Sequence, residues 1–210
     1  MRVVILAAGK GERLSPLTGN CPKPLLLYKD KPIISYLLEA VQGHEVAIVI
    51  GYLGDMIKKH LGAKYTYITQ SEQKGDANAL YLAQDFVGGL ISYSGETDRL
   101  FACANADTIM PAEDIQSMLS YNEPIIATYK IQFQLGVINK LDARVLRVTE
   151  KPEFYINAGF YVLPSNIFPH LANETSLAKA VDNCIRARLF TMYSYSIKDW
   201  RHFTSVRDLE

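Results

Sequence analysis

The sequence lacks an excess of charge of either sign, since Lys and Arg together number 22, Asp and Glu number 22, and the formal net charge is zero. Proteins that bind nucleic acid or a membrane surface normally carry a basic excess, so we expect neither partner. No hydrophobic run approaches the length of a membrane span, and Met1-Arg2 leads directly into an apolar segment, which leaves no room for a signal peptide. These absences predict a cytoplasmic protein.

Cysteine is also scarce. The 3 cysteines, Cys21, Cys103 and Cys184, lie far apart and form no CxxC pair. Their number and spacing disfavour a disulfide framework and a zinc site, and free thiols in a reducing compartment are the simplest interpretation. Internal repeats, low-complexity tracts and linkers are missing too, so the 210 residues predict a single domain, residues 1–210.

Apolar runs typical of buried strands alternate with segments of helical periodicity along most of the chain. The first expected strands are residues 3–6, 46–50, 65–69, 100–104 and 125–131, and the expected helices are residues 33–41, 55–61, 77–86, a helix from Pro111, 164–171 and 177–188. This alternation predicts an α/β fold with right-handed crossovers, a mostly parallel central sheet and helices on both faces. Beyond Gln134 we expect a small mixed β lobe with a hairpin of residues 135–139 and 145–149, and strands at residues 156–163 and 190–197.

The first strand runs directly into a loop of very small residues. These are Ala7, Ala8, Gly9 and Gly11. Such residues let the backbone approach a ligand closely and point its N–H groups at an anion. Arg13 and Lys23 add two positive charges beside the loop, which suits phosphate. The P-loop spacing of glycines is missing, and Leu14 stands where the dinucleotide fingerprint has its third glycine, so neither of those motifs applies.

The stretch from Leu6 to Leu26 reads LAAGKGERLSPLT, GNC and PKPLL. It resembles the signature of the nucleotidyltransferases that make nucleotide sugars, LAAGxGxRLxPLT followed by a short gap and PKPLL. The resemblance implies a Rossmann-like nucleotidyltransferase fold. It also implies an enzyme that transfers a nucleoside monophosphate from a nucleoside triphosphate to a sugar 1-phosphate and releases pyrophosphate. The nucleotide-binding residues that it implies here are Leu6, Ala7, Ala8, Gly9 and Gly11. Arg13 would hold the triphosphate, and Lys23 would neutralise charge at the α-phosphate.

A polar segment, Gln70-Ser-Glu-Gln-Lys-Gly75, follows the third expected strand. The amide of Gln70 offers a donor and an acceptor to the edge of a nucleobase, and Gly75 removes a side chain that would obstruct the base. Members of the family carry a base-reading glutamine here with a glycine five residues later, so the resemblance implies that Gln70 and Gly75 bind the nucleotide. Asp76 stands where a threonine is common. Without the resemblance, the same segment fits an ordinary surface loop.

The segment Asn105-Ala106-Asp107 ends the fourth expected strand, where a carboxylate is well placed for a cation at a cleft. The resemblance implies that Asp107 is catalytic and binds Mg²⁺. A second metal-binding aspartate of the family follows a tryptophan near the C-terminus, and His202 occupies that place in this chain. Because a hard cation prefers oxygen to imidazole, we expect weaker Mg²⁺ binding. Three alternatives stay open: Asp199 replaces the second carboxylate, water completes the coordination shell of the cation, or the protein has lost its catalytic activity.

Three further segments resemble the half of the family's cleft that holds the acceptor phosphate and its sugar. They correspond to the family's YG, EKP and NAG motifs, and the acceptor-binding residues that they imply are Gly136, Glu150, Lys151 and Asn157. Lys151 would hold the acceptor phosphate, while the other side chains would meet the sugar hydroxyls. Leu135 replaces the usual aromatic residue before Gly136, so the sugar side of the site is expected to differ.

Two alternatives remain open from the sequence. In the first, the chemistry is the same but CMP passes to phosphocholine, whose quaternary ammonium needs aromatic faces that 13 tyrosines are able to supply. In the second, the chain is a catalytically silent nucleotide-binding regulatory subunit, and His202 is its main support. The expected partners are a nucleoside triphosphate and a small phosphorylated acceptor. The nucleobase, the acceptor and the formation of a homo-oligomer are left undetermined.

Overall fold

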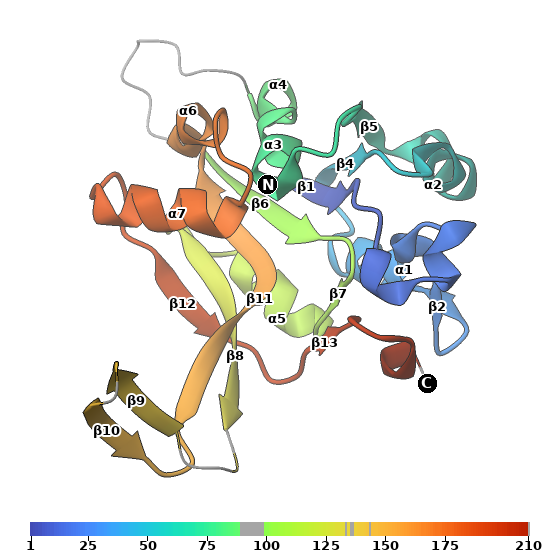
Figure 1. Cartoon of the computed structure of the whole chain (residues 1–210). Helices are drawn as coiled ribbons and strands as arrows, with labels where there is room; N and C mark the ends of the chain where they lie inside the picture. The colour runs from blue at the N-terminus through green and yellow to red at the C-terminus, as the bar shows by residue number, and fades with distance from the viewer. Residues whose placement is uncertain (89–98, 133, 135–136, 143, 210) are drawn as a thin grey trace.

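The computed structural model describes residues 1–88, 99–132, 134, 137–142 and 144–209. A seven-stranded sheet in the order β12-β8-β11-β6-β1-β4-β5 forms the centre of the molecule (Figure 1). Its strands are β1 (Arg2–Ala7), β4 (Glu45–Ile50), β5 (Thr66–Thr69), β6 (Leu100–Asn105), β8 (Ile125–Gln132), β11 (Glu153–Pro164) and β12 (Tyr193–Ser196). β11 is antiparallel to both of its neighbours, and the other neighbouring strands are parallel, which confirms the mostly parallel sheet.

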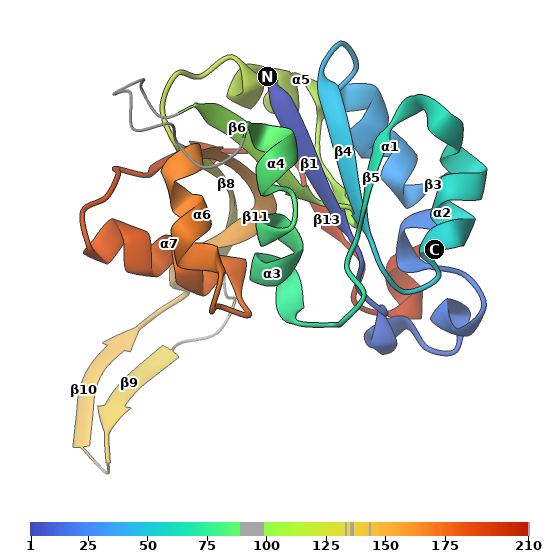
Figure 2. The same ribbon diagram turned by 90° about the horizontal axis from the view of Figure 1, so that it is seen from above.

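Helices cover both faces of this sheet, as predicted (Figure 2). On one face lie α1 (Ile33–Ala40), α2 (Gly54–Leu61) and α5 (Ala112–Leu119), and on the other lie α3 (Gly75–Tyr81), α4 (Gln84–Val87), α6 (Phe168–Leu171) and α7 (Leu177–Arg186). The alternation of side chains along β1 explains its continuous apolar run. Val3 and Ile5 pack toward the first set of helices, whereas Val4 packs toward the second, so a strand covered on both sides has no polar face.

Several elements differ in detail from the expectations. The helix expected at residues 77–86 is divided, because α3 ends at Tyr81 and α4 begins at Gln84. The mixed lobe is smaller than expected, since β11 and β12 belong to the central sheet. β9 (Val137–Leu141) and β10 (Arg144–Thr149) form a separate hairpin, which projects from the body of the molecule (Figures 1 and 2). Residues 92–98, whose polar composition predicts a surface loop, lie outside the described residues.

Short elements that periodicity does not reveal shape the region around the N-terminal loop. The additional pairs are β2 (Leu27–Tyr28) with β3 (Lys31–Pro32), and β7 (Thr108–Ile109) with β13 (Arg201–His202). The single-turn helices are η1 (Glu12–Leu14), η2 (Leu17–Gly19), η3 (Lys23–Leu25), η4 (Gly62–Lys64), η5 (Ser165–Ile167) and η6 (Val206–Leu209). Because β13 pairs with β7, the C-terminal segment lies beside the residues that follow β6. Within the described ranges, no helix combines the length and the apolar character needed to cross a bilayer.

Candidate functional site

The loop after β1 is held in a fixed course at the carboxyl ends of the parallel strands. The carbonyl oxygen of Ala8 accepts hydrogen bonds from the backbone N–H of Tyr52 (3.1 Å) and from Nε2 of Gln73 (2.8 Å). Gly11 has φ +66°, and a Cβ there would lie 3.0 Å from Cγ2 of Thr18 and 3.1 Å from Cβ of Lys23. A side chain at position 11 would therefore push Lys23 out of its place, so the glycine is needed for packing as well as for backbone freedom.

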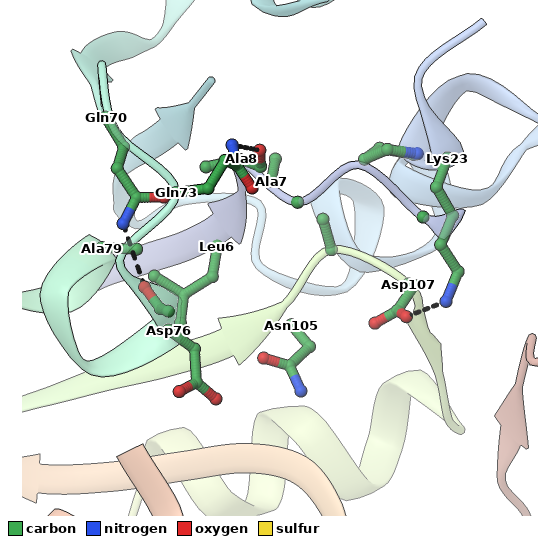
Figure 3. Close-up of a pocket in the computed structure, with 15 residues that line it drawn as sticks. Leu6, Ala7, Ala8, Lys23, Gln70, Gln73, Asp76, Ala79, Asn105 and Asp107 are labelled. Atoms are coloured by element: carbon green, nitrogen blue, oxygen red, sulfur yellow. Dashed lines mark hydrogen bonds and ion pairs between the residues drawn. The ribbon is translucent and has the colours of Figure 1, made fainter. Parts of the chain in front are cut away.

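Two adjoining cavities lie along this loop, with volumes of about 290 and 540 Å³. The first, which we call the inner cavity, is lined by Leu6, Ala7, Ala8, Gly9, Gly11, Lys23, Pro24, Gln70, Gln73, Gly75, Asp76, Ala79, Asn105, Ala106 and Asp107 (Figure 3). The second, which we call the outer cavity, is lined by Lys10, Gly11, Glu12, Arg13, Leu14, Lys23, Gln73, Asp107, His202 and Phe203. All the residues expected to bind the nucleotide or to be catalytic thus line one or both cavities.

An ion pair stands where the two cavities meet. Nζ of Lys23 donates to Oδ2 of Asp107, and the two side chains are only 15% and 19% exposed. In Figure 3 this pair lies at one end of the inner cavity, while Gln70 lies at the opposite end and Asn105 lies between them. Arg13 adds a further positive charge on the outer cavity. The arrangement places a loop of small residues and the three cations Lys10, Arg13 and Lys23 around a space of the size that small-molecule ligands occupy.

Gln70 is buried at the far end of the inner cavity, with 4% of its surface exposed. Its Nε2 donates to the carbonyl oxygen of Gly75 (2.9 Å) and to Oδ1 of Asn78 (3.0 Å). Both amide hydrogens therefore serve to fix the start of α3, and the carbonyl oxygen of Gln70 is the group left to accept from a ligand. Base reading by Gln70 stays a prediction, and the structure adds a second role in holding α3.

Gly75 opens α3 in a conformation with φ +91°. A Cβ there would lie 1.9 Å from the carbonyl oxygen of Thr175, which belongs to the segment that precedes α7. The next residue, Asp76, reinforces the same contact, because its Oδ1 accepts from the backbone N–H of Leu177 at 2.8 Å. Close packing of α3 on the start of α7 is thus a reason for Gly75 that does not depend on a nucleobase.

His202 lies beside Asp107 because β13 pairs with β7. Its Nδ1 is 3.9 Å from Oδ2 of Asp107, and its ring stacks on Trp200 with centroids 5.4 Å apart and planes inclined by 5°. Burial lowers the pKa of His202, and the positive charges of Lys23 and Arg13 act in the same direction against the opposing effect of Asp107. The imidazole is consequently neutral at neutral pH.

Asp199 does not take the place of the missing second carboxylate. It is exposed, its Oδ1 accepts from the backbone N–H of Trp200 at 2.8 Å, and it lies outside the linings of both cavities. In the part of the chain that the structure describes, no three side chains of His, Cys, Asp or Glu converge on one point. Among the residues that the structure describes, Asp107 carries the only carboxylate at the junction of the two cavities.

Asn157 lies close to the walls of the inner cavity without lining it. Its Oδ1 accepts from the backbone N–H of Gly159 at 2.9 Å, and its Nδ2 donates to the hydroxyl of Tyr161. The adjacent carbonyl oxygen of Ala158 accepts from Oγ1 of Thr108 (3.3 Å) and from Nε1 of Trp200 (3.0 Å). These bonds attach the segment to β7 and to the residue before β13, so Asn157 is near the site, although its side chain is engaged within β11.

The other residues expected on the acceptor side are not brought to the cavities. Glu150 and Lys151 are exposed in the turn between β10 and β11, where the carbonyl oxygen of Lys151 accepts from Nε2 of Gln132 at 3.4 Å. Both lie outside the linings of the two cavities. Gly136 and Leu135 lie outside the described residues. Acceptor binding by Gly136, Glu150, Lys151 and Asn157 therefore stays a prediction.

Sequence reasoning missed several polar residues that line the cavities, among them Gln73 and Asn105. Gln73 lines both cavities and fixes the loop through Ala8, and Asn105 lines the inner cavity. Each lies in a segment that the sequence does single out, QSEQKG for Gln73 and NAD for Asn105. Their signal is position, because Asn105 ends β6 and Gln73 lies in the loop after β5, and in an open α/β sheet the carboxyl ends of the strands form the ligand edge.

Comparison with known proteins bears on this site. A family model described as nucleotidyl transferase matches residues 2–192. The bifunctional protein GlmU of Methanococcus maripaludis strain S2 is 30% identical over 185 residues, which cover 82% of this chain and 42% of that protein. The chain thus spans less than half the length of this relative. The UTP–glucose-1-phosphate uridylyltransferase AglF of Haloferax volcanii is 29% identical over 222 residues, covering 96% of this chain and 90% of the relative.

The fold is similar to that of a solved putative glucose-1-phosphate thymidylyltransferase from Bacillus anthracis. The TM-score is 0.69 at 23% sequence identity, and the match covers 100% of this chain and 92% of the other. At that identity the likeness concerns the fold alone. It agrees with the mostly parallel sheet and the two helical layers described above.

Proposed function

This chain belongs to the nucleotidyl transferase family, and we propose that it transfers a nucleoside monophosphate from a nucleoside triphosphate to a sugar 1-phosphate, releasing pyrophosphate. The observation that carries the proposal is the loop of residues 7–11, which borders two cavities that meet at Lys23 and Asp107. A nucleoside fits the inner cavity, with the base toward Gln70. The phosphates then follow the loop toward Arg13 in the outer cavity.

In the proposed step an oxygen of the acceptor phosphate forms a bond to the α-phosphorus. The bond from that phosphorus to the bridging oxygen of the β-phosphate breaks, and pyrophosphate leaves with the electron pair. Such a reaction needs positioning and charge stabilisation more than covalent participation by the protein. Arg13 and the loop amides hold the triphosphate. Lys23 turns from Asp107 to the α-phosphate and neutralises the charge that develops there.

Asp107 is the residue that we propose for a divalent cation, which the resemblance gives as Mg²⁺. Mg²⁺ is commonly bound by one or two carboxylates together with substrate phosphates, so a single partly buried carboxylate beside the proposed triphosphate fits a cation shared with the nucleotide. When bound, the cation would neutralise phosphate charge. Before the nucleotide binds, Lys23 holds Asp107 by an ion pair, and Asp107 lines both cavities.

On the acceptor side we propose that the turn between β10 and β11 moves toward the cavities when the acceptor binds and carries Lys151 and Glu150 with it. Both side chains are exposed in the turn between β10 and β11, so they are able to reorient at little cost in packing. Asn157 and Gly136 would complete this half of the site. The cytoplasmic location, the single domain and the absence of nucleic-acid and membrane partners stay predictions from the sequence, and a homo-oligomer stays open.

The test is pyrophosphate release in the presence of Mg²⁺, with each common nucleoside triphosphate and a panel of sugar 1-phosphates plus phosphocholine. Release with one sugar 1-phosphate identifies the base and the acceptor, and Asp107→Ala should then lower the rate about a hundredfold. Release only with CTP and phosphocholine would identify phosphocholine, and not a sugar 1-phosphate, as the acceptor. Nucleotide binding without release from any pair would contradict the proposed reaction and favour a regulatory subunit.

A further inference from the structure

The inner cavity carries a negative charge that no side chain of the described residues balances. Its charged lining residues are Lys23, Asp76 and Asp107. Lys23 is ion-paired with Asp107, whereas within the described ranges no Lys, Arg or His lies at ion-pair distance from Asp76. The excess negative charge of the lining is therefore located at Asp76, and the proposed reaction gives this carboxylate no role.

Asp76 has one oxygen that is engaged and one that is open to the cavity. Oδ1 accepts from the backbone N–H of Leu177 at 2.8 Å, which anchors the side chain to the start of α7. No hydrogen bond among the described residues uses Oδ2, and the residue is exposed. An ionised carboxylate accepts up to about four hydrogen bonds. Asp76 thus has a fixed orientation and keeps most of its capacity for a ligand.

Asp76 lies on the side of the inner cavity that faces β11. Burial raises the pKa of Tyr161 on β11 to about 12, and the charge of Asp76 makes a smaller contribution in the same direction. In Figure 3, Asp76 and Asn105 point to the same side of the cavity, away from Gln70. A Cβ at Gly159, also on β11, would lie 2.9 Å from Nδ2 of Asn105. The open oxygen therefore belongs to the acceptor half of the site and not to the base end.

The charges of the two cavities favour a ligand with a charge of each sign. The outer cavity is lined by the cations Lys10, Arg13 and Lys23 against two carboxylates, and the inner cavity is lined by one cation against two. An acceptor phosphate that approaches an unpaired carboxylate is repelled by it. A positive group on the acceptor replaces this repulsion by attraction. An N–H donor on that group also forms a charge-assisted hydrogen bond, roughly twice as strong as one between neutral partners.

We propose that Asp76 selects an acceptor phosphate that carries a protonated amino group, and that the acceptor is therefore an amino sugar 1-phosphate. The ammonium donates to Oδ2 of Asp76, and the phosphate of the acceptor lies toward Lys23. The inference rests on the proposed function and narrows its acceptor. Asp76 sets the specificity and takes no part in the bonds that form and break.

The experiment compares matched acceptors in pyrophosphate release by the full chain with Mg²⁺ and each common nucleoside triphosphate. Glucosamine 1-phosphate carries the ammonium, N-acetylglucosamine 1-phosphate keeps the nitrogen without the charge, and glucose 1-phosphate has a hydroxyl there. Phosphoethanolamine carries an ammonium without a sugar. Binding of the α,β-methylene analogue of each nucleoside triphosphate is measured in parallel.

Two variants separate the charge of Asp76 from its structural role. Asp76→Asn removes the charge but keeps an oxygen that accepts from Leu177. The control, Asp85→Asn, removes an equal charge from an exposed position on α4 that lines neither cavity. Melting temperatures are recorded for both variants.

We expect the unmodified protein to use glucosamine 1-phosphate with a kcat/KM about tenfold or more above that for the other two sugars. Asp76→Asn should remove most of this preference without lowering kcat/KM for glucose 1-phosphate, while Asp85→Asn should retain it. The comparison of acceptors in the unmodified protein tests the proposal even where Asp76→Asn is unstable.

The contrary results separate this inference from the proposed function. Equal use of the three sugars, a preference unchanged in Asp76→Asn, or an equal loss with all three sugars would overturn selection by Asp76 and leave the proposed function intact. Release with phosphoethanolamine and no sugar would overturn the sugar in both proposals. Binding of the nucleotide analogues without release from any acceptor would overturn both.

Discussion

Replacement of Gly75 by alanine tests the contact that positions α3 at the Gln70 end of the inner cavity. The backbone at Gly75 has φ +91°, and a Cβ would lie 1.9 Å from the carbonyl oxygen and 2.8 Å from the carbonyl carbon of Thr175. Two costs follow for Gly75→Ala. A residue with a Cβ loses about 1–2 kcal/mol in a left-handed conformation, and displacement of a packed backbone segment adds about 2 kcal/mol.

Gly43 provides a matched control, because it has a similar φ of +86° but no atom within 4 Å of the position that a Cβ would take. Gly43→Ala should therefore show the backbone cost without the clash. For a chain of this size each 1 kcal/mol shifts the melting temperature by about 2–4 °C. The clash alone then lowers the melting temperature of Gly75→Ala by about 4–8 °C relative to Gly43→Ala.

The assay is thermal or urea unfolding of both variants, followed by equilibrium binding of the nucleotide analogues below the transition. Because the displaced segment bears on α3, Gly75→Ala should also weaken nucleotide binding, whereas Gly43→Ala should leave it unchanged. Equal melting temperatures in the two variants would refute the packing argument. A binding defect without a difference in stability would indicate that Gly75 serves the nucleotide alone.

The remaining predictions concern a charge, a tyrosine and the thiols. Lys23→Ala should lower the rate of pyrophosphate release about a hundredfold, while Lys64→Ala, which removes an equal charge from an exposed position, should have little effect; similar rates would contradict the assignment. Burial raises the pKa of Tyr161 to about 12. The pKa in the unfolded chain is about 10, so the stability that the neutral hydroxyl contributes is complete below about pH 10 and is lost between about pH 10 and 12. Tyr161→Phe should therefore reduce the fall in unfolding free energy with pH over this interval. An unchanged dependence on pH would contradict the assignment of this fall to Tyr161. Cys21 should be alkylated well before the buried Cys103, whose pKa burial also raises, as peptide mass spectrometry can measure; prior reaction of Cys103 would be inconsistent with the fold.

The parts of the fold that the sequence predicts are those whose signal is local. A strand such as β1, covered on both faces, is an uninterrupted apolar run, and the loop after it carries its ligand-binding character in consecutive small residues. That the residues proposed for the nucleotide lie together could be predicted for the same reason, since residues 6–23 form one contiguous stretch. Gln70, Gly75 and Asp107 join it because parallel strands bring their carboxyl ends to one edge.

The parts that the sequence does not predict depend on tertiary contacts. β7 and β13 have two residues each, too few for any periodicity, and their pairing is established only when the C-terminal segment packs on the N-terminal loop. The division between α3 and α4 is another example, because the apolar pattern continues through residues 82–83 while the backbone does not remain helical there. The position of Lys151 likewise follows from the course of the β9–β10 hairpin, which the EKP motif does not specify.

The packing of Phe203 explains why the two ends of the chain share one cavity. Phe203 is buried in a small core with Leu14, Leu26 and Ile33, and its ring meets that of Tyr28 edge-on with centroids 5.2 Å apart. This core fixes the C-terminal segment against η1, so the lining of the outer cavity includes both the N-terminal loop and the pair His202 and Phe203. A phosphate bound between these two parts of the lining would contact both ends of the chain at once. This apolar core thus holds the lining of the outer cavity in place for a charged ligand. It does so without adding a further charge to the site.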